Sequence, residues 1–331
     1  SNSGARLVYA VFDDRLHVWT IKDGKVRSNW VPVTQEKLDG LVANFVRNCA
    51  DPLSPLAEVQ EQGKVLFDLL VAPFAGEFSS DQTMTFEVDQ QLWKLPLSAL
   101  RTPDSKYLAE KYYIAYSPGV LVEASLRKPS VVQPQSDFLL VNAFPERTQE
   151  LAGISPLFNH PVVFNRPTNK EEVFGVMMRS EDVIYFGHAV RQGRAVALKL
   201  NDDILLEAAD FLPLKKSNLS LIVLAACSTA TGGRSGLLDN NALVRSFLVA
   251  GVPHVVASQW DVYNVSTARL MVSFFQNSLG GQAPHVALAH AERRLLQAAG
   301  NENLHPHYWA GFIAVGRVDS AEAVSTNVAL R

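Results

Sequence analysis

Apolar residues recur along the chain with two spacings, and the order of these spacings predicts an α/β fold. Short apolar runs and alternating runs predict strands, whereas apolar residues three and four positions apart predict helices. In the second half of the chain the two patterns alternate, which favours a mostly parallel sheet with helices on both faces. The predicted strands are 6–12, 15–22, 26–33, 83–88, 111–116, 138–143, 183–186, 194–200, 221–226, 254–260 and 310–315, and the predicted helices are 37–50, 56–71, 169–178, 205–211, 237–249, 265–279 and 284–299.

A polar, proline-containing stretch at 129–135 is predicted to separate two halves of the chain, 1–130 and 131–331. The first half begins with a predicted hairpin whose strands meet at Asp13-Asp14. Thr168 is a candidate N-cap for the helix at 169–178.

Composition excludes several classes of protein. Of the 331 residues 47% are apolar and 19% are charged, which is typical of a globular chain with a large core. The net charge of −3 gives no electrostatic reason to expect nucleic acid or an anionic membrane as a partner. No apolar run approaches the ~20 residues of a membrane-spanning helix. The two cysteines, Cys49 and Cys227, favour a reducing cytoplasm over a disulfide framework, and their spacing to histidines does not predict a zinc site. We expect neither a metal nor a cofactor, and we interpret Cys49 as a core residue.

Two apolar runs end in residues that carry chemistry. The run 221–226 is followed by Cys227 and then by small hydroxyl residues and a glycine pair, and the run 182–186 is followed by Gly187 and His188. Ligands bind at the carboxyl ends of strands in open parallel sheets. A histidine at one strand end and a cysteine at the next would form a base and a nucleophile. From these residues alone, a buried structural cysteine and a hydrogen-bonded core histidine remain open alternatives.

Several segments together carry a resemblance to a known family. They are Tyr-Phe-Gly-His at 185–188, Leu-Ala-Ala-Cys-Ser-Thr-Ala-Thr-Gly at 224–232, Ala-Gly-Val-Pro-His-Val-Val-Ala-Ser-Gln-Trp-Asp-Val at 250–262, His-Pro-His-Tyr-Trp-Ala-Gly-Phe at 305–312, and Leu-Trp-Lys-Leu-Pro-Leu-Ser-Ala-Leu at 92–100. This set resembles the CHAT family of caspase-like cysteine peptidases, and 260–262 is also similar to a strand end in separase. The resemblance implies a caspase-like α/β fold with a degenerate caspase-like or accessory unit as its amino-terminal half.

The resemblance also implies roles for individual residues. Cys227 would be the nucleophile and His188 the base, and the backbone N–H groups of Cys227 and Ala189 would bind the oxyanion. Ala189 stands where the family usually has glycine. Asp261 would lie at the base of a pocket for a basic side chain, and Asp202 and Asp203 are weaker candidates for that role. The remaining predicted substrate-binding residues are Gly187, Ser258 and Trp260.

The predicted function is that of a cysteine endopeptidase acting on specific protein substrates, cutting after a basic residue. By resemblance its setting would be bacterial signalling, defence or cell death in the cytoplasm, with a pore-forming gasdermin-like protein as one example of a substrate. A helical-repeat or sensor domain outside this chain is an expected partner. One alternative is a catalytically silent scaffold that binds a partner protein. Another is a different hydrolytic or acyl-transfer enzyme with the same dyad, which the absence of a Gly-x-Ser-x-Gly elbow and of a Gly-x-Gly-x-x-Gly loop disfavours.

Overall fold

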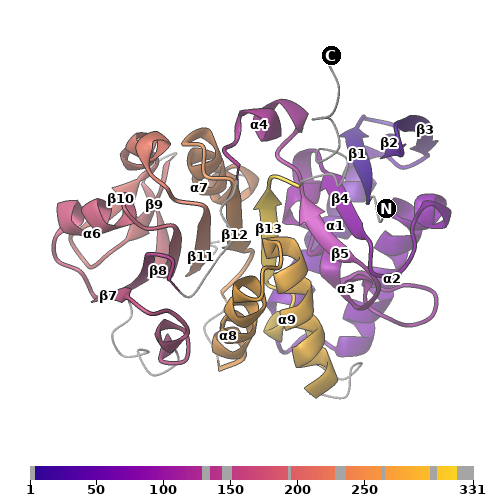
Figure 1. The fold of residues 1–331 in the computed structure, drawn as a ribbon. Helices are drawn as coiled ribbons and strands as arrows, with labels where there is room; N and C mark the ends of the chain where they lie inside the picture. The colour runs from indigo at the N-terminus through magenta and orange to yellow at the C-terminus, as the bar shows by residue number, and fades with distance from the viewer. Residues whose placement is uncertain are drawn as a thin grey trace, which may run out of the picture.

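The computed structural model describes residues 4–128, 135–143, 151–192, 195–227, 236–261, 265–298 and 304–318. For Gln90, Cys227 and the positions 191–192, 195–196 and 236–242, it describes the backbone alone. Figure 1 shows the strands forming one continuous sheet with helices packed against it.

Most predicted elements are present with their bounds within a few residues. The strands are β1 (Ala5–Val11), β2 (Leu16–Lys22), β3 (Lys25–Val31), β4 (Thr83–Glu87), β5 (Tyr113–Tyr116), β6 (Phe138–Asn142), β7 (Pro161–Asn165), β8 (Asp182–Gln192), β9 (Ala195–Lys199), β10 (Leu205–Glu207), β11 (Leu221–Cys227), β12 (His254–Ser258) and β13 (Phe312–Gly316). The α-helices are α1 (Gln35–Ala50), α2 (Leu56–Leu70), α3 (Leu108–Lys111), α4 (Val120–Ser125), α6 (Lys170–Met177), α7 (Gly236–Val249), α8 (Val265–Leu279) and α9 (Pro284–Ala298).

The sheet runs through both halves of the chain in the order β10-β9-β8-β11-β12-β13-β5-β4-β1-β2-β3. Strand β13 is the last of these strands along the chain. It pairs antiparallel with β12 and parallel with β5, and so joins the two halves. Parallel pairs outnumber antiparallel ones among the described strands, as the sequence predicts for a mixed α/β fold. The predicted boundary at 129–135 lies almost wholly outside the described residues.

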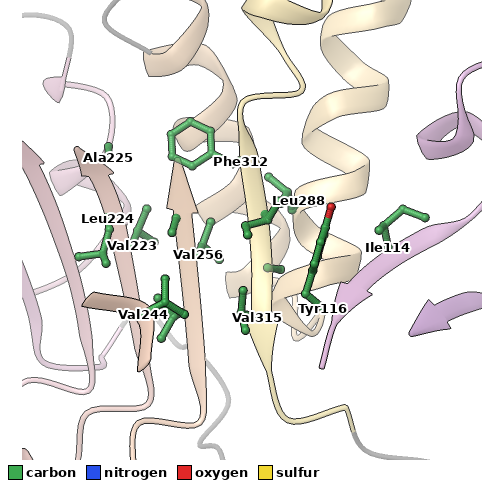
Figure 2. Packing of buried hydrophobic residues seen from close by; sticks show 14 of the residues in the cluster. Ile114, Tyr116, Val223, Leu224, Ala225, Val244, Val256, Leu288, Phe312 and Val315 are labelled. Carbon is green, nitrogen blue, oxygen red and sulfur yellow. The ribbon is translucent and has the colours of Figure 1, made fainter. Parts of the chain in front are cut away.

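The core is continuous across this junction. Figure 2 shows apolar side chains from β11, β12, β13 and β5 in one row, together with Leu288 of α9 and Val244 of α7. Phe312 and Val315 of β13 and Tyr116 of β5 are each at most 2% exposed. These residues belong to one buried cluster, so the two halves share one hydrophobic core. Burying an apolar side chain of this size stabilises the fold by about 1.5–3 kcal/mol.

The first two strands form the predicted hairpin, and β3 extends it to three antiparallel strands. Buried and partly exposed residues alternate along β1 and β2, which pair antiparallel. Asp23 and Gly24, with φ of 49° and 71°, form the two-residue turn to β3. Positive φ at both positions is the requirement of the type I′ turn that matches strand twist. Helix α1 begins after Thr34, whose hydroxyl accepts a hydrogen bond of 3.3 Å from the Lys37 N–H.

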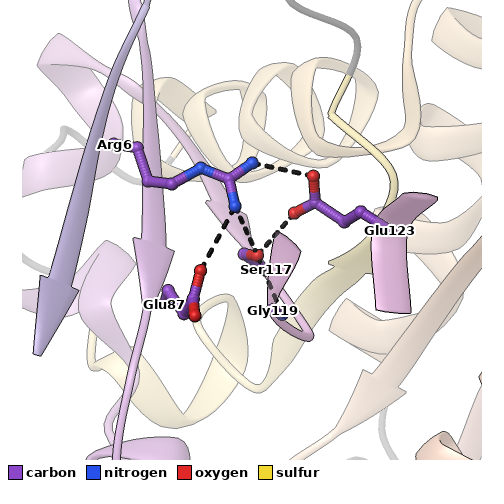
Figure 3. A network of polar contacts seen from close by, with 5 residues as sticks. All are labelled: Arg6, Glu87, Ser117, Gly119 and Glu123. Atoms are coloured by element: carbon purple, nitrogen blue, oxygen red, sulfur yellow. Dashed lines mark hydrogen bonds and ion pairs between the residues drawn. The ribbon is translucent and has the colours of Figure 1, made fainter. Parts of the chain in front are cut away.

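A polar network ties α4 to the amino-terminal strands. Arg6 of β1 donates to Glu123 of α4 at 2.7 Å, to Ser117 at 3.0 Å and to Glu87 of β4 at 3.3 Å (Figure 3). The Gly119 N–H donates to the Ser117 hydroxyl at 3.0 Å, with φ of 102° at this glycine. Since Arg6 and Glu123 are largely buried, the Glu123 carboxylate needs the guanidinium to balance its charge.

Several local predictions are wrong or incomplete. The strand predicted at 183–186 continues as β8 to Gln192, so His188 lies within the strand. The helix predicted at 205–211 is instead strand β10 followed by a 3₁₀ segment, Ala208–Lys216, because β10 pairs with β9 and Pro213 interrupts a regular helix. Asn169, not Thr168, caps α6, since its side-chain oxygen accepts from the Glu172 N–H at 2.9 Å. Strand β7 was not predicted, because most of its side chains are exposed and show no alternation.

Candidate active site

Strands β8 and β11 lie side by side and parallel, and they bring His188 and Cys227 together. Their register runs from Leu221 beside Asp182 to Cys227 beside His188. Neighbouring strands are about 4.8 Å apart, and residues in register lie on the same face of a sheet. The backbones of the two residues are thus neighbours in the sheet, and the side chain of Cys227 lies outside the described part of the structure. The His188 side chain is exposed.

His188 lies where β8 changes its neighbour on the other side. Up to Phe186, β8 pairs with β6, and from His188 onward it pairs antiparallel with β9. His188 is the register partner of Lys199 in β9. The order across this edge of the sheet is therefore Lys199, His188 and Cys227.

Tyr185 lies in β8 just before this strand changes its partner from β6 to β9. Its ring is fully buried, and its hydroxyl lies 2.9 Å from the carbonyl oxygen of His188 and 2.6 Å from that of Lys199. The hydroxyl hydrogen thus joins the two backbone segments that carry these residues. A Cβ on Gly187 would lie 2.6 Å from Tyr185 Cζ and 2.8 Å from Ala143 Cβ, so the tyrosine ring requires glycine there.

Ser258 ties the end of β12 to the end of β11. Its hydroxyl lies 2.5 Å from the Ala226 carbonyl oxygen and 3.3 Å from that of Leu224. Ser258 is buried. It was predicted to bind substrate, and in the structure its hydroxyl contacts the backbone just before Cys227. Gly187 and Ser258 therefore both have packing contacts that account for their residue types.

Ala189 has an ordinary strand conformation. It pairs with Leu198 of β9, is 3% exposed, and is not among the described non-glycine residues with positive φ. Alanine at the position where the family usually has glycine is therefore unstrained. Its N–H, like that of Cys227, remains a predicted oxyanion donor.

Trp260 and Asp261 follow β12 on the far side of β11 from His188. Trp260 is buried, and its indole N–H donates to the His307 carbonyl at 3.2 Å. Asp261 is exposed. Burial lowers the pKa of His307, and the Ala50 carbonyl and the charges of Asp51 and Asp261 oppose this shift. Asp261 thus lies near enough to His307 for their charges to interact.

The sequence named Asp202 as a weaker candidate for the substrate pocket but assigned no role to Lys199, the register partner of His188, or to Arg166. Lys199 Nζ lies 2.9 Å from Asp202 Oδ1, and Arg166 lies 2.8 Å from Asp202 Oδ2. The hydrogen bond and charge of Lys199, together with Arg166, hold the pKa of Asp202 below its usual value. Asp202 already serves two cations, so it is poorly suited to a basic substrate side chain.

The described residues include no group of three His, Cys, Asp or Glu side chains that could hold a metal ion. None of the helices in the described ranges combines the length and apolar character needed to cross a membrane.

The fold of this chain is that of the caspase-like α/β proteins. Two crystal structures of the Saccharomyces cerevisiae separase–securin complex match this chain with TM-scores of 0.58 and 0.56 at 10% and 11% identity. They cover 96% and 95% of this chain and 30% of theirs. A crystal structure of the Arg-specific cysteine proteinase gingipain R matches with a TM-score of 0.47 at 11% identity, over 85% of this chain and 75% of that one.

Within this class, the CHAT domain model matches residues 60–317, and the chain belongs to the CHAT domain family. Among curated proteins, tetratricopeptide repeat protein 28 of Mus musculus is 22% identical over 325 residues, which is 76% of this chain and 13% of that protein. The Homo sapiens protein of the same name is 22% identical over 367 residues, 88% of this chain and 15% of that protein. The chain thus spans less than a sixth of the length of these relatives.

Proposed function

We propose that this chain is a cysteine endopeptidase in which Cys227 is the nucleophile and His188 the general base. The observation that supports this most is the register of β8 and β11, which pairs His188 with Cys227 at the carboxyl end of β11, where the parallel pairing of the two strands ends. Membership of the CHAT family and a caspase-like fold agree with it. A histidine next to a cysteine takes the thiol proton and holds the thiolate.

In the proposed reaction, the Cys227 thiolate attacks the scissile carbonyl carbon, and the carbonyl oxygen becomes an oxyanion. The N–H groups of Ala189 and Cys227 would stabilise this charge, and one such donor is worth about 3–4 kcal/mol. His188 gives its proton to the leaving amine as the C–N bond breaks, which leaves a thioester. Water, deprotonated by His188, then releases the acid and restores the thiol.

We place the substrate residue before the cleaved bond near Asp261, which would favour a basic side chain. Asp261 supports this because it is exposed and follows β12, the strand next to the one that carries Cys227. The setting in bacterial signalling, defence or cell death, with a gasdermin-like substrate, belongs to this proposal and rests on family membership alone. A helical-repeat partner agrees with the name of the tetratricopeptide repeat relatives.

The test is covalent labelling with a peptide electrophile that carries arginine at its reactive end. We expect labelling of the wild type and its loss in Cys227→Ala, with strong slowing in His188→Ala. Cys49→Ala is the matched control, because Cys49 is fully buried and burial raises its thiol pKa well above the usual value. Equal labelling of Cys227→Ala and wild type would reject the proposal, and a folded, unlabelled wild type would favour the silent scaffold.

A further inference from the structure

The Lys199–Asp202–Arg166 cluster lies beside His188, and the proposed mechanism gives it no part. We propose that Lys199 and Arg166 bind an acidic side chain of the substrate, on the carboxyl-terminal side of the bond that is cut. This inference rests on the proposed peptidase function and adds a second determinant of substrate choice.

The position of Lys199 follows from strand pairing. Lys199 is the register partner of His188 across the antiparallel pair β8–β9, so the two side chains leave the sheet on the same face. The Lys199 side chain is 31% exposed, which leaves its ammonium group accessible from solvent. A substrate bound over His188 and Cys227 would therefore meet Lys199 one strand further along.

The charges of the cluster are unequal. Asp202 is shared between Lys199 and Arg166, so among the described residues the two cations have one carboxylate between them. Asp203 is the next residue, but it makes no ion pair among the described residues, and its N–H donates to Asn201 Oδ1 at 2.8 Å. A carboxylate supplied by a peptide would complete the pairing of the two cations. Arginine and lysine are both suited to this, and arginine can bind a carboxylate through two N–H groups.

The proposed chemistry decides which side of the cleaved bond meets the cluster. His188 must reach the leaving amine to protonate it, so the substrate continues from Cys227 toward His188 on the leaving-group side. The strand beyond His188 is β9, which carries Lys199. Asp261 follows β12, on the opposite side of Cys227. Three strand spacings separate β9 from β12, about 14 Å, which about four extended residues would span.

The preferred substrate therefore has a basic residue before the cleaved bond and an acidic residue within the first three positions after it. We would test this with peptides that keep arginine before the bond and carry Glu, Gln or Lys at each of those three positions. The probes are the peptides themselves, and kcat/KM is measured by mass spectrometry of both products. At one of the three positions we expect Glu to be preferred over Lys by ~2–5-fold, the range of a partly exposed ion pair.

Three variants make the test specific. Lys199→Gln should remove most of the preference for Glu, and Lys199→Glu should reverse it toward Lys. Asp202→Asn should increase the preference, because it removes the carboxylate that competes with the substrate. Lys215→Glu is the control: this exposed residue lies in the segment before β11 begins, away from the carboxyl end of that strand, and should change nothing.

The outcomes separate this inference from the function on which it rests. If Cys227-dependent cleavage occurs but the ratio of Glu to Lys is the same in wild type and Lys199→Glu, the inference is wrong and the peptidase function stands. A charge effect confined to positions before the bond would overturn it equally. If no peptide is cut and no electrophile labels Cys227, the peptidase function fails, and this inference fails with it.

Discussion

Replacing Tyr185 by phenylalanine removes one oxygen atom from the point where β8 exchanges β6 for β9. In the wild type that hydroxyl lies 2.9 Å from the His188 carbonyl oxygen and 2.6 Å from the Lys199 carbonyl oxygen. Phenylalanine keeps the buried ring and its packing against Gly187. The substitution therefore tests the hydrogen bond alone.

Its effect on stability can be stated from this geometry. A buried acceptor that loses its donor costs about 1–3 kcal/mol, so we expect unfolding to become easier by about 2 kcal/mol. With a urea dependence of about 3 kcal/mol/M, the unfolding midpoint would fall by roughly 0.7 M. His188 is held through its own carbonyl, so its ring should also be less well placed. A misplacement of 1 Å can cost ~100-fold in rate, and we expect kcat/KM to fall by at least about tenfold.

The assay combines urea unfolding with the pH dependence of Cys227 alkylation by iodoacetamide. If Tyr185 positions His188, then Tyr185→Phe should move the alkylation midpoint to higher pH, because the thiolate loses part of its partner. The matched control is Tyr9→Phe, since the buried Tyr9 hydroxyl donates to the Leu70 carbonyl at 2.8 Å, far from this site. The control should lose similar stability without a change in alkylation.

Two results would refute this reasoning. An unchanged urea midpoint in Tyr185→Phe would show that the hydroxyl contributes no net stability. A lower midpoint with an unchanged alkylation profile would show that Tyr185 stabilises the sheet without positioning His188.

Three further predictions concern stability. Burial raises the pKa of Glu292 from its ordinary 4.5 to about 8, so the folded state keeps a proton that the unfolded state releases, and stability should fall as pH rises toward 8. Glu292→Gln should flatten this fall by about 2 kcal/mol between pH 6.5 and 8, and parallel urea-midpoint curves for the two proteins would contradict it. Gly187→Ala should destabilise by about 1–3 kcal/mol, because its Cβ would collide with the Tyr185 ring; a calorimetric scan that matches the wild type would count against this contact. Arg6→Met should cost about 3–5 kcal/mol by leaving the Glu123 carboxylate buried without its ion pair, and adding Glu123→Gln should recover part of the loss in chemical denaturation.

Local pattern was sufficient for much of the fold. The apolar run 221–226 became β11 and the spacing of 265–279 became α8, because a strand or helix of that length shows its buried face directly in the order of residues. Cys49, interpreted as a core residue, is fully buried. Prediction failed where the secondary structure of a segment depended on pairing with another strand. The chain at 205–207 is a strand because β9 is available to pair with it.

The candidate site divides in the same way. The apolar run 221–226 was enough to place Cys227 at the end of a strand, since the end of a strand depends on residues nearby in the sequence. The strand expected to end at Phe186 continues to Gln192, and this extension brings Lys199 beside His188. The apolar run ends at Phe186, so it does not indicate that the strand goes on and pairs with β9.

By itself, the order of apolar and polar residues determined most of the strands and helices, and that a histidine and a cysteine each stand at the end of an apolar run. Only the tertiary structure decided that β13 joins the two halves, that His188 and Cys227 are in register, and that Lys199 lies beside His188 and shares Asp202 with Arg166. The physical reason is that periodicity reports which face of a segment is buried. The choice of neighbouring strand depends instead on contacts between residues far apart in the chain.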